Sequence, residues 1–152
     1  MEKLNIKDLR IGNLFCGKDF PQDAALPIIS ISDSNIIIFK NYREPNKQLL
    51  LDELEPIKIN SNWLFKFGFK KYEDVIDNDY EHYDRYVLEE AIDKSRSFEV
   101  HIIYSSHGGK KYTIDYCYSI GKSNRFYVKD PEFIHTLQNT FLLFSGNELK
   151  LK

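Results

Sequence analysis

The chain carries several groups of residues whose types could support chemistry, and an acid–base pair is the first of them. His101 and Asp115 lie in two neighbouring segments of alternating apolar and polar residues, a pattern typical of a β-hairpin. A three-residue loop at 107–109 would set His101 directly opposite Asp115. A carboxylate orients and charges an imidazole, so this pair could act in acid–base catalysis. We favour the alternative, a cross-strand surface pair that contributes at most about 1 kcal/mol.

Two segments resemble ligand-binding loops but lack residues that those loops need. Gly121-Lys122-Ser123 matches the end of a phosphate-binding loop, yet the glycine expected five residues earlier is Tyr116. Residues 77–81 resemble the start of a calcium loop, yet His82 and Leu88 stand where Gly and Glu are needed. The four histidines do not have the spacing of metal ligands. We therefore expect a turn, an acidic loop, no metal site and no cofactor.

Two further sets of residues are candidates for binding a ligand. His135, Gln138 and Asn139 lie three and four residues apart, which places them on one side of a helix. Such groups could contact a ligand, but we prefer hydrogen bonds to neighbouring backbone. The second set consists of Tyr83, Tyr86, Lys110 and Lys111. Tyrosine rings stack on bases where a basic groove accompanies them, whereas most tyrosines pack in strands and cores.

Composition indicates one folded domain over residues 1–152, because 42% of the residues are hydrophobic and 14% are aromatic. The net charge of −2 favours neither nucleic acid nor anionic membranes as a partner. Cys16 and Cys117 are far apart in the sequence, which indicates a reducing, cytoplasmic setting. No apolar run approaches the roughly 18 residues of a membrane span, so we expect no membrane association.

Short strands must position most of these residues. A first hairpin is expected from Ile28–Ser32 and Asn35–Phe39, with a turn at Asp33-Ser34. The isoleucines that would face one another across it are Ile29, Ile31, Ile36 and Ile38. The segments Phe98–Ser106 and Lys110–Tyr118 predict a second hairpin. Burial of its large side chains requires both segments to turn them to the same face, which favours the three-residue loop with Gly109 at positive φ.

Two helices are expected to cover the strands. Asn60 can cap a short helix over Ser61–Phe67, and Gly68 can end it. A longer helix is predicted over Pro131–Ser145, with Asp130 as its cap and Gly146 as its stop. The apolar stripe of this helix contains Phe133, Leu137, Phe141 and Phe144. Arg125–Lys129 predicts a last strand, and Arg85–Lys94 fits either a helix or a strand.

Three stretches together resemble a known family. They are Ile6–Asn13, Asn62–Phe69, and Ile134–Asn139 followed by Gly146 and Glu148-Leu149. Their order and spacing are similar to those of small proteins of Bacteroidetes, their phages and mobile elements, which read LRIGN, EWLLKFGF and HQLQNLYFALTGEEL. The resemblance spans nearly the whole chain and implies one domain. It implies no particular activity and no catalytic residues.

The sequence therefore predicts an α+β fold. We expect a bent antiparallel sheet, or a small open SH3-like barrel, covered by two helices of which the longer is C-terminal. The expected function is that of a non-catalytic binding protein of phage or mobile-element origin. It would act in the cytoplasm of the host cell by holding a host protein or a small nucleotide-like ligand. Alternatives are an accessory module for single-stranded nucleic acid and an enzyme that uses His101 with Asp115.

Overall fold

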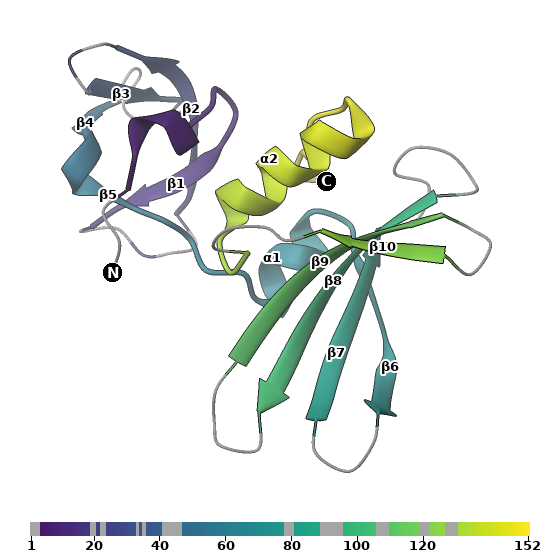
Figure 1. Ribbon diagram of the computed structural model, residues 1–152. Helices are drawn as coiled ribbons and strands as arrows, with labels where there is room; N and C mark the ends of the chain where they lie inside the picture. Colours follow the sequence, from purple (N-terminus) through teal and green to yellow (C-terminus); the bar gives the residue numbers. More distant parts are fainter. Residues whose placement is uncertain are drawn as a thin grey trace.

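The computed structural model describes residues 4–18, 21, 24–32, 34, 36–40, 47–77, 81–88, 96–105, 110–118, 122–126 and 131–152. Of residues 73–77, 81–83, 96, 105, 115–118 and 122–126, only the backbone is described. This part of the chain forms two five-stranded antiparallel sheets and two α-helices (Figure 1). The predicted α+β class with a longer C-terminal helix is confirmed, and both sheets are open.

The N-terminal sheet has the strand order β4-β3-β2-β1-β5. Its strands are β1 (Leu14–Gly17), β2 (Leu26–Ile31), β3 (Ile36–Phe39), β4 (Lys47–Leu50) and β5 (Leu54–Glu55). The 3-10 helix η1 (Ile6–Asp8) precedes β1, and the 3-10 helix η2 (Leu51–Glu53) joins β4 to β5. Consecutive strands thus pair in a meander, and β5 returns to lie beside β1.

The predicted hairpin of β2 and β3 is confirmed, but the expected facing of Ile29 and Ile31 with Ile36 and Ile38 is not observed. Ile28, Ile37 and Phe39 are buried, whereas Ile29 is 39% exposed. A β-bulge between Ile28 and Ser30 shifts the pairing, so that Ile31 lies opposite Ile37. Because one extra residue reverses the alternation, Ile29 and Ile31 lie on opposite faces, with Ile29 outward and Ile31 packed against the core. Of the predicted turn Asp33-Ser34, Asp33 lies outside the described part of the chain, as does Asn35, the predicted first residue of the second strand.

The second sheet has the strand order β10-β9-β8-β7-β6. Its strands are β6 (Lys70–Asp77), β7 (Glu81–Leu88), β8 (Arg96–Ser105), β9 (Lys110–Tyr118) and β10 (Lys122–Phe126). The ambiguous segment at 85–94 is a strand as far as Leu88, and residues 89–95 are not described. Lys122 and Ser123 pair with β9, so they begin the last strand, which starts three residues before its predicted position at 125.

The pairing of β8 with β9 confirms the predicted shared face but corrects the register. Val100 lies opposite Ile114, so the large side chains of both strands point to the same side. The last pair is Tyr104 with Lys110, which makes the connection longer than predicted and moves every pair by two residues. His101 therefore lies opposite Thr113, not Asp115. A shift of two keeps each side chain on its face, so core burial cannot select between these registers. Gly109 is outside the described residues.

Helix α1 (Ser61–Lys66) begins and ends as the sequence predicts. The side chain of Asn60 accepts a hydrogen bond of 3.1 Å from the backbone N–H of Trp63. Gly68 follows the helix with a φ of +88°. The cap satisfies one of the backbone donors that a helix start leaves open, and glycine adopts the left-handed conformation without strain.

Helix α2 (Ile134–Ser145) ends at Gly146 as predicted, but it begins three residues later than Pro131. The backbone before it is extended and pairs with the segment after β5. Ile59 N–H donates to Glu132 O over 2.7 Å, and Ile134 N–H donates to Ile57 O over 2.9 Å. These bonds to a distant segment hold the residues before Ile134 out of the helical conformation. Asp130, the predicted cap, is not among the described residues.

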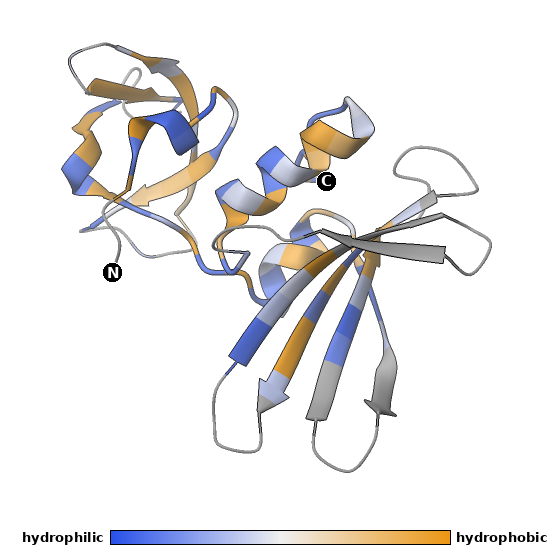
Figure 2. Cartoon of the chain, viewed as in Figure 1, coloured by the Kyte–Doolittle hydropathy of each residue, from blue (hydrophilic) through white to orange (hydrophobic). Residues whose placement is uncertain are grey.

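Two groups of buried side chains form the core. Figure 2 shows hydrophobic residues on the strands and helices that supply these groups. The smaller group lies in the N-terminal sheet and contains Leu9, Phe15, Ile28, Ile37, Phe39 and Leu54. The larger joins β1, both helices and the second sheet. In it, Leu137 and Phe141 of α2 are buried, and the Phe141 ring lies edge-on to Phe98 of β8 with centroids 5.2 Å apart. Helix α2 therefore contacts both sheets and closes the larger core.

Candidate functional site

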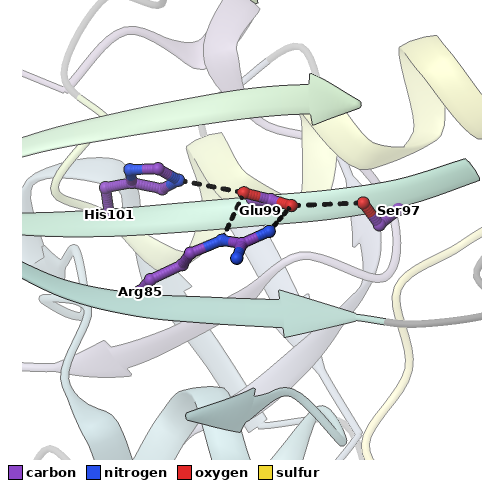
Figure 3. Close-up of polar contacts among 4 residues, drawn as sticks. All are labelled: Arg85, Ser97, Glu99 and His101. Carbon is purple, nitrogen blue, oxygen red and sulfur yellow. Dashed lines mark hydrogen bonds and ion pairs between the residues drawn. The ribbon is translucent and has the colours of Figure 1, made fainter. Parts of the chain in front are cut away.

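A cluster of polar side chains lies on the face of the second sheet opposite the helices. Phe98, Val100 and Ile102 of β8 point into the core, so the residues between them point to the other side. Those residues are Glu99 and His101. Pairing of β7 with β8 adds Arg85, which lies opposite His101. Figure 3 shows these side chains turned toward one another, with Ser97 beside them.

Glu99 is the centre of this cluster and is only 4% exposed. Arg85 donates two hydrogen bonds to its carboxylate, from Nε to Oε2 over 2.8 Å and from Nη2 to Oε1 over 2.5 Å. His101 Nε2 lies 3.1 Å from Oε2, and Ser97 Oγ donates to Oε1 over 3.3 Å. A two-pronged arginine contact has the geometry of the strongest charge-assisted pairs in proteins. The buried carboxylate is thus surrounded by donors from two strands (Figure 3).

The electrostatic state of Glu99 follows from this geometry. Burial would raise the pKa of its carboxyl, but the hydrogen bonds and charges of His101 and Arg85 outweigh burial. The result is a pKa lowered from 4.5 to about 2. Glu99 therefore stays ionised at neutral pH and compensates the charge of Arg85.

The predicted pairing of His101 with Asp115 is wrong, because the carboxylate bonded to His101 belongs to Glu99. Residues two apart in a strand share a face. The sequence alone therefore indicates that the side chains of Glu99 and His101 are neighbours on one face of β8. Asp115 lies opposite Glu99 in the backbone register, and its side chain is outside the description. The imidazole thus has the oriented carboxylate of an acid–base pair, but Arg85 and Ser97 share that carboxylate.

A second polar cluster lies on the helix side of the same sheet, around Asp84. Tyr104 donates to Asp84 Oδ2 over 2.9 Å, and Lys71 Nζ lies 2.7 Å from Oδ1. The Tyr86 hydroxyl is 3.4 Å from Oδ2 and 2.7 Å from Ser61 Oγ. Burial, followed by the bond to the Asp84 carboxylate, raises the pKa of Tyr104 to about 12. Tyr104 therefore stays protonated and can donate its hydrogen bond to Asp84 at any ordinary pH.

The predicted tyrosine and lysine candidates do not form one surface. Tyr86 is fully buried in the larger core. Lys110 is exposed, and its Nζ lies 5.4 Å from the centroid of the Tyr104 ring. Lys111 is also exposed but pairs with Ile103, which places it on the other face of the sheet. Tyr83 also lies opposite Ile103, and its side chain is not described. Among the candidates whose side chains the structure describes, Lys110 lies beside the partly exposed ring of Tyr104.

The polar trio of α2 contacts the protein itself. Gln138 Oε1 accepts a bond of 2.9 Å from Leu14 N–H, and its Nε2 donates to Gly12 O over 3.2 Å. Asn139 Nδ2 donates to Asp8 O over 3.0 Å. The predicted hydrogen bonds to neighbouring backbone are thus present for both amides. The ring of His135 stacks on the rings of Phe15 and Phe133, with centroids 4.8 and 5.8 Å away.

Sequence reasoning missed two partners of this trio, Arg10 and Asn13. Asn139 Oδ1 accepts from Arg10 Nε and from Asn13 Nδ2, each over 2.9 Å. Asn13 is fully buried, and its Oδ1 accepts from the backbone N–H of Arg10 over 2.9 Å. Both residues belong to the first of the three stretches on which the family resemblance depends, and Asn139 belongs to the last. The presence of both stretches in the same family-like pattern was the sequence signal that could have predicted this contact.

Comparisons of this chain with protein families, with curated proteins and with solved structures found no match in any of the three. Within the described ranges, no three or more His, Cys, Asp or Glu side chains are grouped so that they could hold a metal ion. Across the same residues, neither helix has the length and apolar character needed to cross a membrane. Functional inference therefore depends on the geometry of this chain.

Proposed function

We propose that this protein is a non-catalytic binding protein of phage or mobile-element origin, acting in the host cytoplasm on a host protein or a small nucleotide-like ligand. The origin is supported by the three family-like stretches, at 6–13, 62–69 and 134–149. The first and last of these stretches are in contact in the fold, through Asn13 with Asn139 and Gly12 with Gln138. The binding role is supported by a surface of the second sheet.

The observation that carries the proposal is the helix-side face of the second sheet where it extends beyond α1 and α2 (Figure 1). We call this region the Tyr104 surface and define it by Lys71, Asp84, Tyr104 and Lys110. It contains the partly exposed ring of Tyr104, the exposed Lys110, and Lys71 paired with the buried Asp84, on four neighbouring strands. Rigid strands hold side chains in fixed positions, which reduces the entropy lost on binding.

The arrangement around Glu99 supports a structural role for the other polar cluster. Its carboxylate is bonded to Arg85 and Ser97 as well as to His101. A catalytic imidazole must exchange a proton with a substrate while its carboxylate stabilises the charge that forms. Here the guanidinium of Arg85 already compensates that carboxylate, so we assign the cluster to holding β7 and β8 together.

The N-terminal sheet supports a finer assignment, an SH3-like fold. Its meander β1 to β4, the 3-10 helix η2 before β5, and the pairing of β5 with β1 are the order expected of such a domain. Small β-domains of this kind carry many unrelated binding functions, so the topology agrees with a binding role without specifying a ligand.

Affinity capture and ligand screening test the proposal. The intact protein, its Lys110→Glu variant and its Lys111→Glu variant would each be immobilised against lysate of a Bacteroidetes host and screened by thermal shift against nucleotides. We expect a saturable partner or a stabilising ligand that Lys110→Glu loses and Lys111→Glu retains. The two variants change the net charge equally, on opposite faces of β9. Equal behaviour of both variants, or an absence of any partner, would contradict the proposal.

A further inference from the structure

We propose that residues 147–152, which we call the closing segment, cover a binding site for an extended segment of a partner protein, and that such a partner replaces them. The closing segment follows α2 and runs back along it, since Gln138 in the first half of the helix bonds to Leu149 (Figure 1). It then reaches α1, where Lys152 bonds to Lys66. This site is separate from the Tyr104 surface and does not depend on the function proposed for that surface.

The closing segment contacts the two helices through one buried leucine and through its backbone. Leu149 is only 5% exposed and belongs to the larger core. Its carbonyl accepts a hydrogen bond of 3.4 Å from Gln138 Nε2, and the N–H of Lys152 donates to Lys66 O over 2.9 Å. Between these points the Lys150 side chain is 77% exposed. A buried side chain combined with main-chain hydrogen bonds is the mode by which proteins recognise extended peptides.

The groups that bind this backbone are held by other parts of the protein. Gln138 Oε1 accepts from Leu14 N–H over 2.9 Å, and its Nε2 also donates to Gly12 O over 3.2 Å, so the amide keeps its orientation without the closing segment. Lys66 is the last residue of α1, and the last four carbonyls of a helix have no donor within it. A site that is already in its bound geometry loses less entropy on binding.

The closing segment can detach while the rest of the protein stays folded. The ion pair of Glu148 with Lys150 lies within the segment and is exposed at both side chains, so it attaches the segment to neither helix. The side chain of Lys152 lies against Gly68 but is exposed to solvent. Release of Leu149 and of the two backbone bonds is therefore a local event, and local opening is more frequent than global unfolding.

The partner must bind more tightly than the closing segment does, because a segment of the same chain has a much higher effective concentration than a free one. A second copy of this protein offers the same residues and has no such advantage. A different protein gains the advantage by covering apolar surface that the closing segment leaves open. Phe65, next to Lys66 in α1, is 48% exposed. We therefore expect a partner segment with a leucine in the place of Leu149 and an apolar residue that covers Phe65.

Titration with the peptide acetyl-Asn-Glu-Leu-Lys-Leu-Lys-amide, followed by NMR of the isotope-labelled full chain, tests the inference. In the native protein this peptide competes with the closing segment, so we expect weak binding that moves the Lys152 amide signal to the position of a disordered residue. Leu149→Asp detaches the segment and should tighten peptide binding about tenfold or more. Leu151→Asp is the matched control and should bind the peptide as the native protein does, because Leu151 is 47% exposed.

Further controls identify the site and its occupant. A peptide with Asp in place of its first leucine should not bind, and Lys110→Glu should leave peptide binding unchanged, which separates this site from the Tyr104 surface. Circular dichroism would show that each variant is folded. If folded Leu149→Asp binds no peptide, or binds it no better than Leu151→Asp, the inference is wrong. A dimer of the native protein that Leu149→Asp abolishes would assign the site to a second copy and reject a different partner.

Hydrogen exchange of the native protein provides a test that needs no variant. The N–H of Lys152 is bonded to Lys66 O, whereas the N–H of the buried Ile134 is bonded to Ile57 O. After correction for intrinsic rates, the Lys152 amide should exchange about a hundredfold faster or more than the Ile134 amide, and low denaturant should not change its rate. Equal rates that rise together with denaturant would mean that the closing segment leaves only on global unfolding, and would overturn the inference.

Discussion

Gln138 of α2 accepts a hydrogen bond of 2.9 Å from the backbone N–H of Leu14 in β1. The same side chain donates to Gly12 O over 3.2 Å and to Leu149 O over 3.4 Å. One amide thus joins the N-terminal sheet, the last helix and the segment after it. Because Gln138 and Leu14 are both buried, water cannot replace these bonds if the amide is removed.

Replacement of Gln138 by Ala should destabilise the protein by about 1–3 kcal/mol, since it leaves the buried Leu14 N–H without an acceptor. Urea unfolding followed by Trp63 fluorescence would measure the difference. Leu143→Ala on the same helix is the control, because Leu143 is 78% exposed and its loss should change stability by no more than about 0.5 kcal/mol. Equal effects of the two substitutions would show that the amide does not join the elements.

Stability should fall in acid because of Glu99. Its pKa is lowered from 4.5 to about 2 on folding, so its contribution is complete above about pH 5 and is lost as the pH falls through 2. A difference of that size corresponds to about 3 kcal/mol. Unfolding free energies measured between pH 7 and pH 2 should show this loss in the native protein and a smaller loss in Glu99→Gln. A pH dependence that Glu99→Gln leaves intact would assign it to other carboxylates.

The partner of Glu99 provides a control that does not depend on pH. Glu99→Leu alone leaves the Arg85 guanidinium without its buried counter-ion and should cost about 3 kcal/mol. Adding Arg85→Leu should recover part of that loss, because two apolar side chains can replace a buried ion pair with little change in stability. If the double variant is as unstable as the sum of the single variants, the two residues are not coupled.

Two leucines near the C-terminal end of the chain form a matched comparison. Leu149 is 5% exposed within the larger core, whereas Leu151 is 47% exposed. Leu149→Ala should lower the unfolding free energy by about 2 kcal/mol or more, and Leu151→Ala should change it by no more than about 0.5 kcal/mol. Thermal unfolding of both variants measures the difference. Similar melting temperatures would mean that the segment after α2 adds little to the core.

Heating should unfold the two sheets together. The larger core includes Leu14 and Cys16 of β1 with Phe98 of β8 and Phe141 of α2, so neither sheet can open without exposing it. We expect one transition with equal calorimetric and van't Hoff enthalpies, in agreement with a single domain. Two separate transitions would show that the sheets are independent units.

Local features of the fold could be predicted because short stretches of sequence determine them. Asn60 caps α1 and Gly146 ends α2 through contacts within a few residues, and both were predictable. The start of α2 was not, because Glu132 pairs with Ile59, far away in the sequence. Alternation fixed which residues of β8 face the core, but it leaves registers that differ by two residues equivalent.

The same holds for the candidate sites: the kinds of contact could be predicted from nearby residues, whereas the partners that are distant in the sequence could not. The bonds of Gln138 and Asn139 to backbone were predicted from the general need of buried amides for partners, while the identity of their partners Gly12 and Asn13 was not. Glu99 was missed as the carboxylate beside His101, although the two-residue period of a strand places them together. The Asp84 and Tyr104 pair joins two strands, and only the observed register brings these residues within bonding distance.

The division of the core into two groups has a consequence for the order in which a growing chain can fold. The smaller group uses residues from Leu9 to Leu54 only, so it can close soon after η2 and β5 have left the ribosome. The larger group needs Ile134, Leu137, Phe141 and Leu149. Until they emerge, Trp63, Leu64 and the core face of β8 lack their cover. The apolar residues of α1 and the second sheet therefore stay uncovered from the time they are made until α2 follows, an interval in which chaperones can protect them.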